Sequence, residues 1–252
     1  MKTIPICAVS YNRKEAVKKW IESLLLSLEE EYEYELYIHD NNSKDGTYEF
    51  LKETIEKYNV ENNPLKVFAV YQSDKNIGKP KALNNLFMNV NKDYKFIVSS
   101  DSDLILPKGW TSALLSLMEE TPKLGMLSPL YVKNSNNPVL GYDIIDKLIP
   151  ERNLFYFRKD IGNSIAGGFI MLSAEAFWEV GGYTEAGIYG GNDAKLNTKL
   201  ANKGYDCAYT SKIYIEHLKA IEEYNGYEGW KRDVHKKMHR ESGYSIDKGF
   251  WD

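Results

Sequence analysis

Two carboxylates, Asp101 and Asp103, are separated by a single serine and follow a short apolar run at 96–98. The run is typical of a buried strand, which would deliver both acids to its carboxyl end. Unpaired charge beside a core strand is costly, and a divalent cation would offset the mutual repulsion of the two acids. An exposed corner in which aspartate merely favours the turn would have the same residues. The pair by itself therefore leaves a metal site and a polar turn open.

The elements before this pair alternate between strand and helix patterns. Strands are predicted at 4–9, 36–39, 65–71 and 96–100, and apolar residues at helical spacing predict helices at 16–28, 48–58 and 82–90. This order predicts parallel pairing in an α/β sheet. Ligands of open α/β sheets bind outside the carboxyl ends of the strands. Four polar clusters fall there, which favours a binding site: 11–13, 40–42, 76–81 and 101–103.

The second half of the chain is less regular. Helices are predicted at 110–118, 174–180 and 192–200, and strands at 124–130, 167–172, 207–209 and 213–215. Residues 133–163 have no clear period, which is typical of a functional or a flexible segment. Trp230, Val234 and Met238 stand four residues apart and predict a terminal helix packed on the body. The sequence contains no internal repeat, so we do not expect independent domains.

The composition is that of an ordinary globular protein. Of 252 residues, 43% are hydrophobic and 27% are charged, and the net charge of −4 gives no global basic field for nucleic acid or anionic membranes. Cys7 and Cys207 lie in apolar segments and are expected to be buried thiols rather than a disulfide or a zinc site. The sequence has no signal-peptide apolar region and no apolar run of the roughly 18–20 residues that span a bilayer. We therefore expect a soluble, cytoplasmic protein.

Six motifs together resemble glycosyltransferase family 2, which contains nucleotide-diphospho-sugar transferases of the A-type glycosyltransferase fold. The resemblance covers about residues 3–217, and its motifs are 9–13, 40–47, 76–84, 101–103, 181–183 and 190–193. It implies a single Rossmann-like α/β domain of three layers with a mostly parallel central sheet. We expect a transferase domain at 1–218, with a nucleotide-binding half (1–103) and an acceptor half (104–218), and a C-terminal helical extension at 219–252.

The resemblance implies a reaction that depends on Mn²⁺ or Mg²⁺. A sugar nucleotide has a diphosphate leaving group, and a cation stabilises the charge that develops on it. Asp103 would bind the metal directly, and Asp101 would contact the metal, with or without a bridging water, or the ribose. His217, at the end of the last predicted strand, is the third candidate ligand, and a structural histidine would look the same in sequence.

The same resemblance assigns the nucleotide site. Tyr11 would lie against the base, and Asp40 would accept a hydrogen bond from a base N–H, which suits the N3–H of uracil and favours UDP over purine nucleotides. Arg13, Lys79 and Lys81 would place positive charge near the diphosphate or the ribose. A half-buried tyrosine, a capping aspartate and surface cations are the structural alternatives. The motifs add further expected contacts: Ser10, Asn12, Asn76, Gly78 and Ser102.

An attacking acceptor hydroxyl must lose a proton, which calls for a positioned carboxylate. In the family this base is the aspartate of a Glu-Asp pair at a helix N-terminus, and here the pair is Asn192-Asp193. The resemblance therefore implies that Asp193 is the general base of an inverting transfer. The asparagine removes a charge that often contacts the acceptor. Glycines at 167–168 and 190–191 would let the backbone approach the sugar closely.

Two other functions remain open from the sequence. A nucleotidyltransferase of related topology usually has a Gly-rich basic loop after the first strand, which residues 10–13 lack. A non-catalytic sugar-nucleotide-binding module would not need Asp101, Asp103 and Asp193 together. The expected partners are a UDP-sugar donor and a hydroxyl acceptor, whether glycan, protein, lipid-linked sugar or nucleic acid. A basic stretch at 231–240 would suit an anionic acceptor, and a solvated helix face is the simpler explanation of it.

Overall fold

The computed structural model describes residues 1–58, 63–132, 149–151, 153–157, 165–185 and 192–218. Its strands are β1 (Lys2–Ser10), β2 (Tyr32–Asp40), β3 (Leu65–Gln72), β4 (Phe96–Asp101), β5 (Leu104–Ile105), β6 (Leu124–Tyr131), β7 (Ile149–Glu151), β8 (Leu154–Tyr156), β9 (Phe169–Ser173) and β10 (Asp206–His217). Its helices are α1 (Lys14–Ser27), α2 (Thr47–Lys57), α3 (Lys79–Phe87), α4 (Trp110–Glu120), α6 (Ala174–Glu179) and α7 (Asn192–Asn202).

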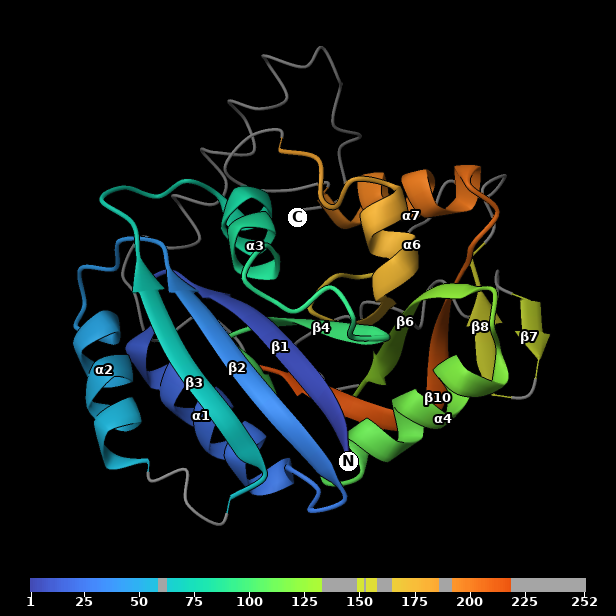
Figure 1. Ribbon diagram of the computed structural model, residues 1–252. Coiled ribbons are helices and arrows are strands. Elements are labelled where there is room, and N and C mark those ends of the chain that lie inside the picture. Colours follow the sequence, from blue (N-terminus) through green and yellow to red (C-terminus); the bar gives the residue numbers. More distant parts are fainter. Residues whose placement is uncertain (59–62, 133–148, 152, 158–164, 186–191, 219–252) are drawn as a thin grey trace, which may run out of the picture.

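One mixed sheet forms the centre of the molecule (Figure 1). Its order is β3-β2-β1-β4-β9-β6-β10-β8-β7, and the short β5 pairs with β10 outside this path. β1 is parallel to β2 and β4, β2 to β3, and β6 to β10, whereas β9 runs antiparallel between β4 and β6. The carboxyl ends of β1–β4, β6 and β10 therefore lie along one edge of the sheet. The segment before β9 reaches the same edge, because Phe169 pairs with Ser100.

Helices cover both faces of this sheet, which makes three layers (Figure 1). One apolar core joins the sheet to α1 and α4 through the fully buried side chains of Trp20 and Trp110. A second core joins the other face to α3, α6 and α7 through Leu83, Phe177 and Leu196. Each large apolar side chain buried in this way stabilises the fold by about 1.5–3 kcal/mol. The predicted three-layer α/β architecture with a mostly parallel sheet is confirmed.

Several predicted elements differ in detail from the structure. The strands predicted at 207–209 and 213–215 are one strand, β10, whose pairing with β6 changes register between Thr210 and Tyr214. The stretch without a clear period contains the antiparallel pair β7 and β8, which the sequence did not predict. The helix expected around Trp230 lies outside the described residues.

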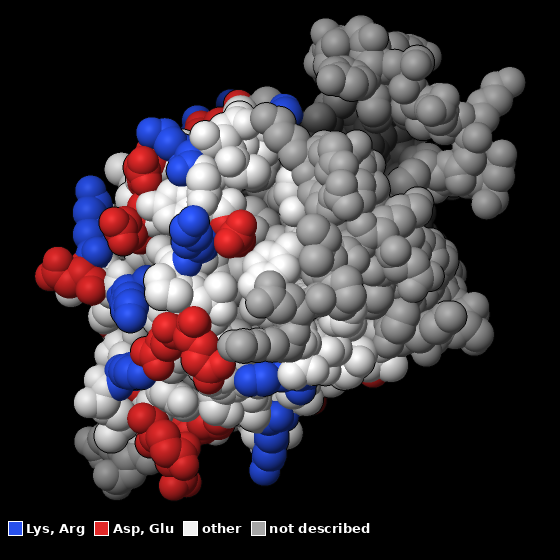
Figure 2. Space-filling model, turned by 90° about the vertical axis from the view of Figure 1, so that its right-hand side faces the viewer, with Lys and Arg blue, Asp and Glu red and all other residues white. Residues whose placement is uncertain are grey.

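Charged side chains of both signs are interspersed over the described part of the face in Figure 2. This distribution agrees with a sequence whose net charge is only −4. Within the described ranges, no helix is both long enough and apolar enough to cross a membrane.

Candidate active site at the carboxyl edge of the sheet

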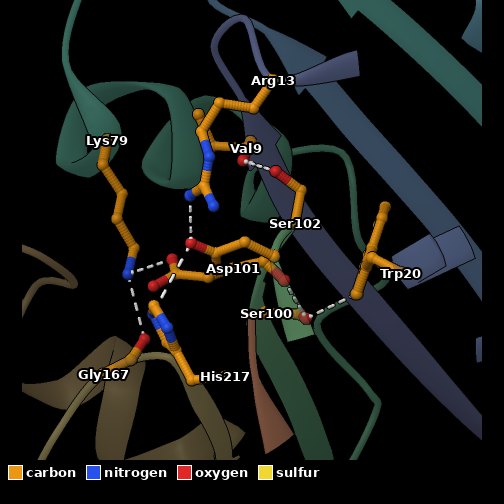
Figure 3. Close-up of polar contacts among 10 residues, drawn as sticks. Val9, Arg13, Trp20, Lys79, Ser100, Asp101, Ser102, Gly167 and His217 are labelled. Carbon is orange, nitrogen blue, oxygen red and sulfur yellow. Dashed lines mark hydrogen bonds and ion pairs between the residues drawn. The ribbon is translucent and has the colours of Figure 1, made fainter. Parts of the chain in front are cut away.

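Asp101 and Asp103 lie at the carboxyl end of β4, next to β1 and β10. Arg13 Nη1 forms an ion pair with Asp103 Oδ2, and His217 Nε2 lies 3.5 Å from the same oxygen (Figure 3). Burial alone would raise the pKa of the Asp103 carboxyl, but His217 and Arg13 together more than offset this and hold the pKa below its usual value. Asp103 is therefore a carboxylate at neutral pH.

The second oxygen of Asp103 tests whether this site fits a metal ion. Oδ1 is buried and has no hydrogen-bond partner in the described part of the chain. A buried carboxylate oxygen without a donor is a fitting ligand for a hard divalent cation. Among the described residues, no three His, Cys, Asp or Glu side chains are already arranged around one point. Asp103 thus fits a cation, while the expected set with Asp101 and His217 requires some movement.

Arg13 reaches Asp103 because the turn after β1 is sharply bent. Asn12 and Arg13 have φ angles of 55° and 66°, a left-handed conformation that asparagine tolerates better than most residues. Asn12 is held on both sides, since its amide N–H donates to Ser43 Oγ at 2.7 Å and its Oδ1 accepts from the Lys44 amide at 2.8 Å. The turn is thereby fixed to the loop after β2, and the Arg13 side chain is directed into the site.

Lys79, the first residue of α3, compensates the other acid. Its Nζ lies 2.6 Å from Asp101 Oδ1 and donates a hydrogen bond to the Gly167 carbonyl at 3.0 Å (Figure 3). Burial alone would lower the pKa of Lys79, but Asp101 and Asp193 raise it well above its usual value. The ammonium therefore stays charged and links the end of β4 to the segment before β9.

Asp193, the second residue of α7, packs directly against this segment. A Cβ built on Gly167 would overlap the carboxyl carbon and both carboxylate oxygens of Asp193. Only glycine therefore leaves room for the carboxylate in this position. Asp193 Oδ1 is buried and has no hydrogen-bond partner among the described residues. The neighbouring Asn192 is also buried, and the expected glycines at 190–191 lie outside the described ranges.

Residues 166–168, called the glycine segment below, are pinned at three points. The Ala166 amide donates to the Tyr209 hydroxyl at 2.6 Å, and the Gly168 carbonyl accepts from the Asp101 amide at 2.6 Å. The Gly167 carbonyl accepts from Lys79, as described above. Because each residue has its own anchor, the segment is a fixed surface between Asp101 and Asp193.

Asp40 is fully buried and already accepts four hydrogen bonds. Its Oδ1 accepts from the Ser43 amide and Gln72 Nε2, and its Oδ2 accepts from the hydroxyls of Ser10 and Ser43. Two carboxylate oxygens offer about four acceptor positions. A nucleobase N–H would have to displace one of these donors, so the predicted base contact stays a prediction. In the structure Asp40 ties the last residues of β1 and β3, Ser10 and Gln72, to the loop after β2.

The other predicted nucleotide residues lie along the same edge, with different exposure. Ser102 donates to the Val9 carbonyl at 3.0 Å, and Asn76 Oδ1 accepts from the Gly78 amide at 2.9 Å just before α3. Gly78 has a φ of 86°, which favours glycine. Tyr11 is half-buried, whereas Lys81 is exposed on α3, two residues after Lys79. Ser102 and Asn76 therefore shape the loops, and among the described residues it is Lys79, not Lys81, that pairs with Asp101.

Tyr131 belongs to this edge and was not singled out from the sequence. The predicted strand at 124–130 ends one residue too early, because β6 continues to Tyr131. The aromatic side chain is 3% exposed, and its ring centroid lies 6.4 Å from that of His217. The signal that would have found it is a polar-tipped aromatic residue at the last position of a parallel strand.

Comparison with known proteins places the chain in a family. The sequence profile of the family described as Glycosyl transferase family 2 matches residues 6–181. No curated protein sequence matches the chain significantly. Solved structures with a similar fold include TarS 1–349 from S. aureus, with 17% identity and a TM-score of 0.64 over 86% of this chain and 60% of that one.

Two further structures have the same fold. The mannosyltransferase PcManGT from Pyrobaculum calidifontis, in complex with GDP-Man and Mn²⁺, is 17% identical with a TM-score of 0.64, over 98% of this chain and 65% of that one. GalNAc-T7 with UDP, GalNAc and Mn²⁺ is 16% identical with a TM-score of 0.67, over 89% of this chain and 44% of that one. The chain thus spans less than two thirds of each of these proteins. The profile match runs from β1 past α6 and includes both acids of β4, and the chain belongs to glycosyl transferase family 2.

Proposed function

We propose that the chain is a metal-dependent, inverting glycosyltransferase that moves a sugar from a UDP-sugar to an acceptor hydroxyl. The observation that carries this proposal is the position of the Lys79 ammonium, which pairs with Asp101 and also feels the charge of Asp193. The acids proposed for the diphosphate and the acid proposed for the acceptor therefore share one site. They come from distant parts of the sequence.

Asp103 is proposed to hold Mn²⁺ or Mg²⁺ through Oδ1, with His217 beside it and Asp101 as a further ligand or ribose contact. A bound cation would neutralise the charge that develops on the leaving diphosphate. Arg13 supports this role because it compensates Oδ2 and fixes the carboxylate. Lys79 holds Asp101 Oδ1, and Asp101 would turn towards the metal after Lys79 releases that oxygen. The released ammonium then lies within the site and can bind a diphosphate oxygen.

Asp193 is proposed to accept the proton of the attacking hydroxyl. Its Oδ1, which none of the described residues bonds, and its close packing against Gly167 support this role, because a general base needs a free oxygen and a constant position. Asp193 enters from α7, whereas the diphosphate acids enter from β4. A base and a leaving group held by separate elements suit an attack from opposite sides of the sugar, which inverts the anomeric centre.

UDP is proposed as the nucleotide because Asp40, the last residue of β2, would accept a hydrogen bond from the N3–H of uracil in place of one of its four present donors. The S. aureus TarS 1–349 structure in complex with UDP-GlcNAc and the GalNAc-T7 structure with UDP have this fold, and PcManGT with GDP-Man has it too. UDP-sugars and GDP-sugars are therefore compared directly as donors in the test below. We also propose residues 1–218 as the transferase unit, with halves at 1–103 and 104–218, and residues 219–252 as its extension.

A donor screen tests the proposed function. The full chain is incubated with UDP-sugars and GDP-sugars, with Mn²⁺, with Mg²⁺ or with EDTA, and free nucleotide and sugar are followed by mass spectrometry. We expect turnover of a UDP-sugar that EDTA and Asp103→Asn abolish. The control Glu119→Gln removes an acid whose partner is the exposed Lys2, and it should leave turnover unchanged.

Two results would contradict the proposal. Binding of UDP with Mn²⁺ but turnover of no sugar nucleotide would make the chain a binding module. Release of pyrophosphate from a nucleoside triphosphate in the presence of a sugar phosphate would make it a nucleotidyltransferase.

A further inference from the structure

Tyr131, the last residue of β6, places a polar hydroxyl at the carboxyl end of that strand. The Tyr131 backbone pairs with Ile215 of β10, so the position of Tyr131 at the sheet edge is fixed by its own strand and by the neighbouring strand β10. The side chain is only 3% exposed. The hydroxyl has no hydrogen-bond partner among the described residues. Buried polar groups without a partner are uncommon in folded proteins and call for an explanation.

The hydroxyl points at the glycine segment. A Cβ built on Gly168 would overlap the Tyr131 hydroxyl and would lie 3.6 Å from Asp101 Oδ2. The phenol and the Asp101 carboxylate therefore meet over the same glycine. The phenol O–H of a tyrosine can donate a hydrogen bond, and this one is buried at the sheet edge. A donor in this position is available to an oxygen of a bound ligand.

The order of groups along the edge indicates which part of the ligand this is. Asp103, proposed to hold the metal and diphosphate, lies by Arg13 and His217, and Asp193, proposed as the base, lies over Gly167. The transferred sugar must lie between leaving group and base, which is over the glycine segment. On the basis of the proposed function, we propose that the Tyr131 hydroxyl donates a hydrogen bond to an oxygen of the sugar being transferred and thereby helps to select the donor.

Tyr131→Phe tests this contact, because it removes one oxygen and keeps the ring. Dissociation constants for UDP and for UDP-GlcNAc, each with Mn²⁺, are measured by calorimetry for wild type and variant. If the donor screen selects another UDP-sugar, that sugar nucleotide is used. We expect the affinity for UDP to be unchanged and that for the UDP-sugar to fall by roughly tenfold, the effect of one lost hydrogen bond. The kcat/KM for sugar release should fall by a similar factor.

A stability measurement separates this role from a structural one. Because the hydroxyl has no hydrogen-bond partner within the part of the chain that the structure describes, Tyr131→Phe should leave the midpoint of thermal unfolding unchanged or raise it. The matched control is Tyr34→Phe, since the Tyr34 hydroxyl is buried and bonded to Thr111 Oγ1 at 2.8 Å. That variant should unfold at a lower temperature and keep the wild-type ratio of UDP-sugar to UDP affinity.

A set of monodeoxy donors identifies the oxygen. One deoxy analogue should bind the wild type about tenfold more weakly than the parent donor, and it should bind Tyr131→Phe as well as the parent does. Equal losses of UDP and UDP-sugar affinity would overturn the inference, because the contact would then be to the diphosphate. Wild-type affinities for both UDP and the UDP-sugar in Tyr131→Phe would also overturn it. A wild type that binds UDP with Mn²⁺ but turns over no sugar nucleotide would instead refute the proposed function, before any variant is compared.

Discussion

Replacing Gly167 with alanine should damage catalysis by moving the proposed base. The added Cβ would overlap three atoms of the Asp193 carboxyl group, far inside the 3.0 Å below which real Cβ contacts are essentially not found. An ordinary separation requires the carboxylate to move by more than about 1 Å. A displacement of that size near reacting atoms lowers rates by about 10²-fold. We expect kcat for sugar transfer to fall by this factor.

The assay measures the rate of sugar transfer and the affinity for nucleotide separately. Release of UDP from the selected donor gives kcat and KM, and calorimetry gives the affinity for UDP with Mn²⁺. Gly167→Ala should change kcat strongly and the UDP affinity little, because the diphosphate acids lie on β4. Gly125→Ala is the matched control: its Cβ would lie 2.9 Å from Tyr205 Cβ, and neither glycine has a left-handed φ. That variant should lose stability and keep the wild-type kcat.

A double mutant shows whether the effect passes through Asp193. In an Asp193→Ala background the carboxylate is gone, so Gly167→Ala should cost no further activity. Additive losses would mean that Gly167 acts by another route, such as its carbonyl bond to Lys79. A single variant Gly167→Ala with wild-type kcat would refute the reasoning.

Two further predictions concern charge and pH. Arg13→Met removes one partner of a buried ion pair, so without metal it should lower the free energy of unfolding by about 3 kcal/mol. Mn²⁺ should restore part of this loss by binding the Asp103 carboxylate that Arg13 no longer compensates. Equal unfolding midpoints of wild type and variant without metal would contradict this. Burial lowers the pKa of His39, against the opposing effect of Asp40, so the unfolded chain takes up a proton more readily than the folded one. The free energy of unfolding should therefore fall as the pH drops below about 6.5, and it should fall less in His39→Gln. If the free energy of unfolding had the same pH dependence in both proteins between pH 8 and 5, this prediction would be wrong.

The elements with a local period could be predicted from the sequence. α1 and α4 have apolar stripes, and β1 is apolar on both faces, so their type and approximate bounds were predictable. The direction of β9 was not, because its partners β4 and β6 are distant in sequence and pairing depends on the whole sheet. β10 was predicted as two strands, since the polar Ser211 and Lys212 interrupt its apolar pattern. The segment is one strand because its pairing with β6 resumes at Tyr214 after the change of register.

Some features of the candidate site could likewise be predicted from the sequence, and others could not. Residue types and spacing indicate that Asp101 and Asp103 follow a buried strand, and strand order indicates which loops lie near them. The sequence could not indicate that Lys79 pairs with Asp101, or that Asp40 already has four donors, because tertiary packing decides both. Tyr131 was missed because a strand end cannot be located to one residue from an apolar run.

The most direct test of the two proposed aspartate roles compares Asp193→Asn with Asp103→Asn in the same donor assay. If Asp193 is the base and Asp103 holds the metal, Asp193→Asn should lower kcat by about 10²–10⁴-fold with unchanged affinity for UDP and Mn²⁺. Asp103→Asn should instead abolish the gain in UDP affinity that Mn²⁺ provides. Sugar transfer by Asp193→Asn at the wild-type rate would contradict the central claim.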